Sequence, residues 1–459
     1  MNIVTTSTPL KNLQAYAEAQ IRKHNIPGLS LAVWHQGKLH KAAAGILNVD
    51  TGVEATTDSI FRIASITKVF TTSLVMQMVD ERLVDLDKPV KKYLKDFQVA
   101  DSHATEVITV RQLLNHTSGI AGDFFPDDSR QQGNLIKRYV DRCNLLPVIH
   151  PVGEMHSYSN SAFAIAGRLI EVMRGMSWYQ AIDEYVFKPL DMTHAVADPK
   201  AVVRYRVAMG HLNDGNRWVL PERDYRTLGT APGGSTLMMS AEDLITFTRA
   251  HLCYGLSSVG ERWISVDSAK IMQTPVAVKP KLSSIKKQYI GLGWGVTDFD
   301  QTKLRTIGHM GTTNGSLSAV LAIPEQDSVF VVLVNAHKYS ARDDISRELL
   351  LALTGTDNRE PEPSFLEKDI NAFKFVCGCY ESFNTLINIE LCDGQLHMSI
   401  VNKISPIGPE KKILKPIDNE RFVIVNEHGF PTKTVVFLGP DRKGVPQYLL
   451  VGGRINPRI

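Results

Sequence analysis

A serine and a lysine three residues apart lie in an unusually apolar part of this chain. Ser65 and Lys68 belong to FRIASITKVFTTSLVMQMVDE, residues 61–81, in which most other side chains are hydrophobic. Such a run predicts a helix that is buried over most of its circumference. Residues three apart lie one turn along a helix, so the Lys68 amine can approach the Ser65 hydroxyl.

Burial gives this pair a chemistry that an exposed pair lacks. Removal from water disfavours the ammonium form of lysine and lowers its pKa. A neutral Lys68 amine can take the proton of the Ser65 hydroxyl, and the positive end of the helix favours the developing alkoxide. The pattern therefore predicts nucleophilic catalysis by Ser65. The alternative is that Ser65 only caps the helix while Lys68 extends to the surface.

The S-x-x-K spacing is weak evidence by itself, because the chain contains two more copies in SSIKK, residues 283–287. Those copies lie in a lysine-rich stretch without an apolar helix, and we interpret them as a solvated loop. A second motif is more selective: residues 158–160 form the only Y-x-N of the chain, just before a predicted helix that ends at Gly175. Tyr158 can relay a proton there, and Asn160 can bind both the lysine and a substrate carbonyl.

A third motif, His309-Met310-Gly311, lies in a predicted strand with glycines on both sides. Glycines in a strand allow another backbone to approach closely, which favours substrate docking. An earlier H-x-G at residues 35–37 precedes the serine, and we interpret it as part of a β-hairpin.

With these motifs in this order, the chain resembles the penicillin-recognising serine hydrolases, which include class C β-lactamases, D-aminopeptidases and β-lactamase-fold esterases. The resemblance covers residues 10–355 and extends to LLNHTSG, residues 113–119, and GGSTLMMSAEDLITF, residues 233–247. It implies that Ser65 is the acylated nucleophile and that Lys68 and Tyr158 share the general-base and general-acid work. It also implies that the N–H groups of Ser65 and Thr312 form the oxyanion hole. The substrate-binding residues that it implies are Asn160, His309, Gly311 and Thr312.

The chain departs from the β-lactamase pattern at His309, where that group usually has lysine. Histidine is largely neutral at pH 7, so the motif lacks the permanent cation that holds a substrate carboxylate. D-aminopeptidases and many esterases carry H-x-G, and the resemblance therefore implies their substrates more than those of β-lactamases. His116 in LLNHTSG is interpreted as a residue that stabilises its loop.

The order of predicted elements indicates an α/β (α+β) fold in which a β-lactamase-like antiparallel sheet combines strands from both ends of residues 1–355. Helices flank this sheet and form a helical subdomain. A second hairpin is expected with its turn at residues 324–327, and residues 341–355 predict a helix that closes on Gly355. An N-terminal helix is expected with Thr8 as cap and Pro9 at its first position. Residues 356–364 read as a linker. Short β-type runs in residues 365–459 predict a small antiparallel domain, which resembles the lipocalin-like barrels appended to some of these enzymes.

Composition narrows the class of partner. The chain has 51 basic and 48 acidic residues, so neither nucleic acid nor an anionic membrane is expected as partner. The N-terminus lacks the features of a signal peptide, and the five scattered cysteines are expected to be reduced thiols, so the predicted location is cytoplasmic. No metal or other cofactor is expected. A homo-oligomer is left open.

The sequence thus favours a serine hydrolase that acts through an acyl-enzyme on small amides or peptides, particularly those with D-amino acids. A carboxylesterase or β-lactamase of the same fold is one alternative, and a peptide cyclase or other acyl transferase is another. A penicillin-binding sensor without turnover is the alternative from a different class.

Overall fold

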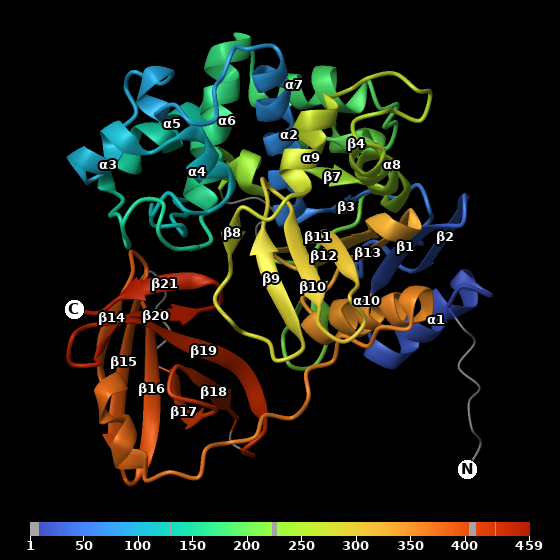
Figure 1. Cartoon of the computed structure of the whole chain (residues 1–459). Helices are drawn as coiled ribbons and strands as arrows, with labels where there is room; N and C mark the ends of the chain where they lie inside the picture. Colours follow the sequence, from blue (N-terminus) through green and yellow to red (C-terminus); the bar gives the residue numbers. More distant parts are fainter. Residues whose placement is uncertain (1–8, 129, 223–226, 404–409, 427) are drawn as a thin grey trace, which may run out of the picture.

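Two eight-stranded antiparallel sheets form the two bodies of the molecule (Figure 1). The computed structural model describes residues 9–459 except 129, 223–226, 404–409 and 427. In the larger body the strand order is β2-β1-β13-β12-β11-β10-β9-β8, so strands from its two ends are neighbours. The predicted mixed fold, with an antiparallel sheet flanked by helices and followed by an all-β body, is confirmed.

The first sheet follows the predicted hairpins closely. Gln36 and Gly37 have φ angles of 50° and 75°, as the two-residue turn of a tight hairpin requires. The second predicted hairpin turns at residues 324–327, between β12 and β13. The strands are β1 (Gly28–His35), β2 (Lys38–Gly45), β8 (Ala277–Val278), β9 (Lys286–Ile290), β10 (Gly295–Phe299), β11 (Arg305–Thr313), β12 (Ser316–Ile323) and β13 (Ser328–Val334).

Helices cover both faces of this sheet (Figure 1). Strand β13 shows the consequence, because Val331 and Leu333 pack in one core while Phe330 and Val332 pack in the other. One face carries α1 (Leu13–His24) and α10 (Tyr339–Thr354). The other core includes α2 (Thr67–Asp80), α4 (Val110–Leu114), α5 (Leu135–Asp141), α6 (Asn160–Arg174), α7 (Trp178–Ile182), α8 (Ala241–Leu252) and α9 (Val266–Gln273), with α3 (Ser102–Val107) at its edge.

The expected start of the first helix was wrong. Asn12 caps α1 by accepting a hydrogen bond from Ala15 N at 3.0 Å, and Thr8 lies outside the described residues. Asparagine is a stronger N-cap than threonine, which explains the later start. At the other end of the body, α10 ends at Gly355 with φ 73°, as predicted.

The second body is an almost closed barrel in which each strand pairs with the next. An isolated bridge between Tyr380 and Arg458 joins the first and last strands. Its core includes Phe373, Phe422 and Phe437. The strands are β14 (Gly378–Glu381), β15 (Thr385–Cys392), β16 (Gln395–Asn402), β17 (Glu410–Pro416), β18 (Arg421–Val425), β19 (Pro431–Pro440), β20 (Pro446–Val451) and β21 (Arg454–Pro457).

The segment with the two other S-x-x-K copies is not the solvated loop that was expected. Ser283 is buried and donates to Glu360 at 2.6 Å, while Lys286 begins β9 and forms an ion pair with the same carboxylate at 3.3 Å. Glu360 lies in the connection to the barrel, so these groups fasten that connection to the first sheet.

Among the described residues, no helix has both the length and the apolar character to cross a bilayer.

Candidate active site

Ser65 lies on a tight turn between a strand and a buried helix. Ala64–Ile66 form a single 3₁₀ turn before α2, and Ala64 has the unusual φ of 47°. Gly234 passes directly behind this turn: a Cβ on it would lie 2.5 Å from the Ala64 carbonyl and 2.8 Å from Ser65 N. Since the φ of Gly234 is 126°, only glycine fits there without strain. The turn lifts Ser65 out of the regular helix and presents its hydroxyl at the edge of a cavity.

Lys68 is fully buried one turn further on, as the sequence predicted. Its Nζ lies 3.2 Å from Ser65 Oγ, 2.7 Å from Asn160 Oδ1 and 2.5 Å from Gly233 O. Burial is the main cause that lowers the pKa of Lys68 well below its ordinary value; the charge of Arg454 lowers it further, and Asp123 opposes both.

The partners of Lys68 fix the direction of its lone pair. A neutral amine has two N–H groups and one lone pair. The Asn160 and Gly233 carbonyl oxygens can only accept, so they take both N–H groups. The lone pair is left for the hydroxyl hydrogen of Ser65. This is the arrangement that a lysine base needs.

The Gly233 carbonyl is itself held in place. Gly233 ends a short 3₁₀ segment, Leu228–Gly233, whose first N–H groups donate to Asp128 at 2.6 and 2.7 Å. Thr71 on α2 donates to the carbonyl of Pro232 at 2.8 Å. The acceptor opposite Lys68 is therefore positioned by both α2 and a buried carboxyl group.

Tyr158 reaches the same point from the residue before the N-cap of α6. Its hydroxyl is hydrogen-bonded to Ser65, and its ring centroid lies 4.7 Å from Lys68 Nζ. Burial raises the pKa of Tyr158 to about 12, although the Ser65 hydrogen bond and Arg454 lower it, so the group is a phenol at neutral pH. The His116 ring stacks on Tyr158 at 4.3 Å and accepts a hydrogen bond from Ser159 N at 3.0 Å.

His116 supports the tyrosine rather than the reaction. It is fully buried, and desolvation, the largest cause, lowers its pKa well below its ordinary value. The neutral ring uses Nδ1 to accept from the backbone and its face to position Tyr158. This agrees with the interpretation of His116 as a residue that stabilises its loop.

Strand β11 forms another wall of the site. Strand β10 pairs with β11 only over residues 305–308, and residues 309–313 continue beside the cavity. His309 donates a hydrogen bond from Nδ1–H to the carbonyl oxygen of its neighbour Met310 at 2.7 Å. Burial lowers the pKa of His309 to about 3, with a further lowering by Lys68, so the ring is neutral. Gly311 does not line the cavity; a Cβ on it would lie 2.3 Å from Ile63 O, so it lets β11 pass close to the serine turn.

The barrel also contributes to the site. Arg454, the first residue of β21, makes a two-point ion pair with Asp123 at 2.8 and 3.1 Å, and its guanidinium lies 4.8 Å from the Tyr158 ring centroid. Asp123 also accepts from Asn160 Nδ2 at 3.1 Å. The Tyr158 N–H donates to the carbonyl of Gly453 at 2.9 Å. No sequence motif marks Arg454, because its place depends on how two distant segments pack.

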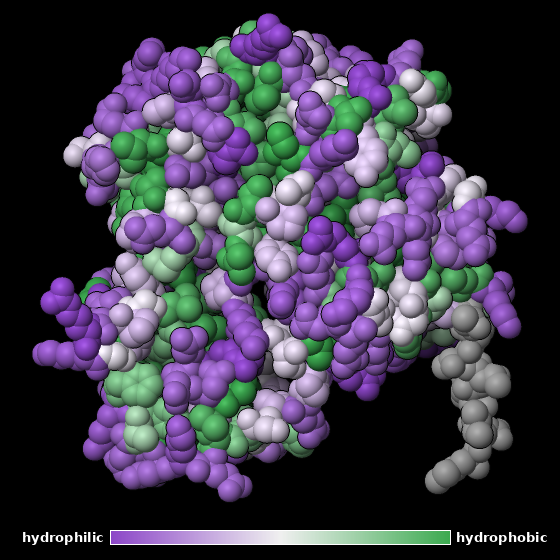
Figure 2. All heavy atoms as spheres, viewed as in Figure 1, coloured by the Kyte–Doolittle hydropathy of each residue, from purple (hydrophilic) through white to green (hydrophobic). Residues whose placement is uncertain are grey.

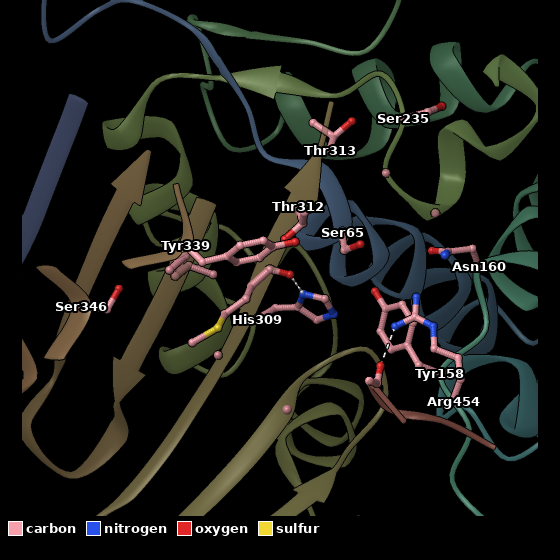
Figure 3. A pocket seen from close by; sticks show the side chains of 18 of the residues that line it. Ser65, Tyr158, Asn160, Ser235, His309, Thr312, Thr313, Tyr339, Ser346 and Arg454 are labelled. Atoms are coloured by element: carbon pink, nitrogen blue, oxygen red, sulfur yellow. Dashed lines mark hydrogen bonds between the residues drawn. The ribbon is translucent and has the colours of Figure 1, made fainter. Parts of the chain in front are cut away.

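Part of this set of residues lines a cavity of about 1180 Å³ (Figure 3). The surface is hollowed where the barrel meets the larger body (Figure 2). Of the residues predicted from the motifs, Ser65, Tyr158, Asn160, His309 and Thr312 line this cavity, and Lys68 lies behind Ser65. In the part of the chain that the structure describes, no group of three or more His, Cys, Asp and Glu side chains could hold a metal ion.

Comparison with known proteins shows the family to which the chain is similar. Residues 13–354 match the family model described as Beta-lactamase. Penicillin-binding protein 4 of Amycolatopsis lactamdurans is 37% identical over 343 residues, which are 74% of this chain and 88% of that protein. The crystal structure of SurE is 25% identical, with a TM-score of 0.78 over 97% of this chain and 98% of that chain. The octameric penicillin-binding protein homologue from Pyrococcus abyssi shares the fold at 21% identity, with a TM-score of 0.65 over 94% and 96% of the two chains.

Proposed function

Because the chain belongs to the β-lactamase family of serine hydrolases, we propose that it cleaves small peptides or amides that contain D-residues, through an acyl-enzyme on Ser65. The observation that carries this proposal is the contact between buried Lys68 and Ser65, in which two fixed acceptors leave the amine lone pair directed at the hydroxyl. A merely structural lysine has no need of this arrangement.

Acylation begins when Lys68 Nζ takes the proton of Ser65 Oγ, which attacks the substrate carbonyl carbon. The N–H groups of Ser65 and Thr312 stabilise the oxyanion, and each such donor is worth roughly a hundredfold or more in rate. The Tyr158 phenol then gives its proton to the leaving amine and regains one from Lys68. The products of this half-reaction are the acyl-serine and the free amine.

Deacylation uses the same groups in reverse. The neutral amine of Lys68, through Tyr158, takes a proton from the attacking water, and the proton returns to Ser65 Oγ as the ester bond breaks. An amine in place of water as acceptor makes the same chemistry an acyl transfer or a cyclisation. Esters fit the same steps, because only the leaving group differs.

The substrate class rests on the third motif. Neutral His309 offers an uncharged surface beside the scissile bond, and the resemblance of H-x-G to D-aminopeptidases favours D-residue peptides and amides over β-lactams. The name of the 37% identical relative supports a second candidate, a protein that binds penicillin at Ser65 without rapid turnover.

A burst experiment tests the proposal. Mixing the protein with p-nitrophenyl acetate should release one equivalent of p-nitrophenol per active site, followed by steady turnover. Ser65→Ala should abolish both phases, whereas Ser284→Ala, in the other S-x-x-K segment, should change neither. A burst without steady turnover supports the sensor, and a wild type that releases no p-nitrophenol contradicts the mechanism. D-alanyl and L-alanyl p-nitroanilides then divide peptidase from esterase.

We also propose that residues 1–355 form the hydrolase domain and that residues 365–459 form a lipocalin-like domain that borders the cleft, with 356–364 as the linker between them. Gly452 and Arg454, which line the cavity, support the bordering role. A homo-oligomer stays a prediction, and size-exclusion chromatography with light scattering tests it.

A further inference from the structure

Lys279 brings a cation to the cavity from a segment that no motif marks. It follows β8 and lines the cavity with residues of β9, β10 and β11. Its ammonium group forms no hydrogen bond or ion pair that the structure gives with any described residue, and burial lowers its pKa. An unpartnered cation in a partly enclosed site is costly unless a ligand pairs with it.

Lys279 stands over the place where β10 begins to pair with β11. Its Nζ lies 3.7 Å from the point where a Cβ on Gly295 would be. Gly295 is the first residue of β10 and pairs with Gly308 on β11. These two glycines leave the sheet bare beneath the ammonium group. The charge of Lys279 also lowers the pKa of His309, the neighbour of Gly308.

The point at which β10 stops pairing with β11 shows how an extended substrate can reach Lys279. Beyond Gly308, residues 309–313 of β11 have no pairing with β10, and this free edge leads from the start of β10 toward Ser65. A peptide can add to such an edge as a further strand. If it runs antiparallel to β11, as β10 does, its C-terminal end points at Gly295 and Lys279.

The strand spacing sets the length of the peptide. Thr312 carries the proposed oxyanion N–H, and Gly308 lies four residues earlier on β11. At about 3.3 Å per residue this separation is roughly 13 Å, the span of about two to four extended residues after the scissile bond. A C-terminal carboxylate at this distance can meet the Lys279 ammonium.

We propose that Lys279 binds the C-terminal carboxylate of a short peptide leaving group that lies antiparallel to the free edge of β11. The inference rests on the proposed hydrolase function and narrows its substrates to peptides with a free carboxylate. His309 itself supplies no charge, and Lys279 provides the missing cation from another element. A site that extends from Ser65 to Lys279 thus favours a short peptide over a simple amide or ester.

The other cations of the cavity are less suited to this role. Arg454 is already paired with Asp123 through two hydrogen bonds. Lys433 lies on the barrel, with its Nζ 3.0 Å from the point where a Cβ on Gly452 would be, so it belongs to the part of the cavity wall that the barrel forms. An anion held by Lys433 is the competing assignment, and the experiment separates the two.

The test uses two thioesters of N-acetyl-D-alanine with the same leaving group, mercaptoacetyl-glycyl-glycine, ending in a carboxylate or in a carboxamide. Transfer of the acyl group to Ser65 breaks the C–S bond, the thiolate takes up a proton, and the free thiol is detected by its reaction with an aromatic disulfide. Wild type should prefer the carboxylate by roughly 10- to 100-fold in kcat/KM, as one charge-assisted hydrogen bond predicts. Lys279→Met should bring this ratio near one, and exposed Lys281→Met should keep it.

The outcomes distinguish this inference from the proposed function. A ratio that Lys279→Met leaves unchanged, or that collapses in Lys433→Met instead, overturns the assignment. If wild type cleaves neither thioester, the hydrolase proposal fails, and calorimetry on Ser65→Ala still tests the subsite. There the peptide N-acetyl-D-alanyl-triglycine should bind more tightly than its amide, and the further change Lys279→Met should erase the difference. Equal loss of affinity for both peptides contradicts it.

Discussion

Burial favours the neutral form of the reacting groups that the larger body places at the cavity, whereas the barrel faces the cavity with a permanent charge. Burial lowers the pKa of Lys68 and of His309, and it raises the pKa of Tyr158 to about 12. Arg454 of the barrel is different: burial lowers its pKa, but the charge and hydrogen bonds of Asp123 outweigh that and keep the guanidinium charged.

The difference separates two tasks. Proton transfer needs groups whose two protonation states are close in free energy, and desolvation by a rigid core provides this. A permanent cation cannot transfer protons, but it changes the pKa of its neighbours through space. The larger body therefore holds the reacting groups, while the barrel adjusts their pKa values.

Loss of the Lys68 amine should have the largest effect. Lys68→Met keeps the length of the side chain but removes the base, and we expect the acylation rate to fall on the order of 10⁴-fold or more. Stopped-flow measurement of the p-nitrophenol burst gives this rate. Lys287→Met, in the other S-x-x-K segment, is the matched control. A burst within tenfold of wild type shows that another group is the base.

Loss of the Tyr158 hydroxyl should cost less, because the Lys68–Ser65 contact survives. Tyr158→Phe keeps the ring that stacks on His116 and lies beside Arg454, so only proton relay is removed. We expect kcat to fall on the order of 10²- to 10³-fold. The same change at Tyr448 of the barrel should have no effect on kcat. A loss confined to KM contradicts the relay role.

The reacting groups were more predictable from sequence than the groups that adjust them. Ser65 and Lys68 are three residues apart, one on the 3₁₀ turn before α2 and the other in the first turn of α2, and local geometry brings them together. Tyr158 and His309 follow in motifs whose order is informative. Arg454, Asp123 and Lys279 meet the site only through tertiary packing, which no local spacing encodes.

The secondary structure was likewise predictable where the signals are local and less so elsewhere. The hairpin turns, α6 and α10 were predicted within about two residues, because turn glycines and caps are local signals. The N-terminal helix began later than expected, since Asn12 competes with Thr8 as a cap. The lysine-rich segment was read as solvated because its partner, Glu360, lies more than 70 residues away.

Backbone strain should also distinguish the two bodies. Gly234→Ala forces a Cβ against the Ala64 carbonyl at a φ of 126°, and we expect a loss of roughly 1–3 kcal/mol in the free energy of unfolding of the larger body. All five tryptophans lie within residues 1–355, so their fluorescence during urea unfolding reports on this body.

Gly444→Ala in the barrel is the control for that measurement. Its φ is 79°, but no atom lies within 4 Å of an added Cβ. The tryptophan transition should therefore stay at the wild-type urea concentration. If both substitutions leave the transition in place, the turn that carries Ser65 is less constrained than the close contact implies.

The charge of Arg454 should be visible in the pH dependence of acylation. The reaction needs the neutral Lys68 amine, so kcat/KM rises as the pH increases through the pKa of Lys68. Arg454 lowers that pKa and Asp123 raises it. Arg454→Gln removes the lowering charge and leaves Asp123 uncompensated, so the acid limb of the pH–rate profile should move to higher pH. The rate on that limb should fall, while the rate on the high-pH plateau should change much less.

Asp123→Asn should move the acid limb in the opposite direction, because it removes the charge that raises the pKa of Lys68 and frees Arg454 to lower it further. Lys433→Gln, on the same barrel wall, should leave the limb in place, since its charge is not among those that act on Lys68. A purely structural role of the Arg454–Asp123 pair lowers the plateau in both variants without displacing the limb. Opposite displacements therefore require a barrel that acts on the catalytic amine through its charge, and displacements of the same sign rule this out.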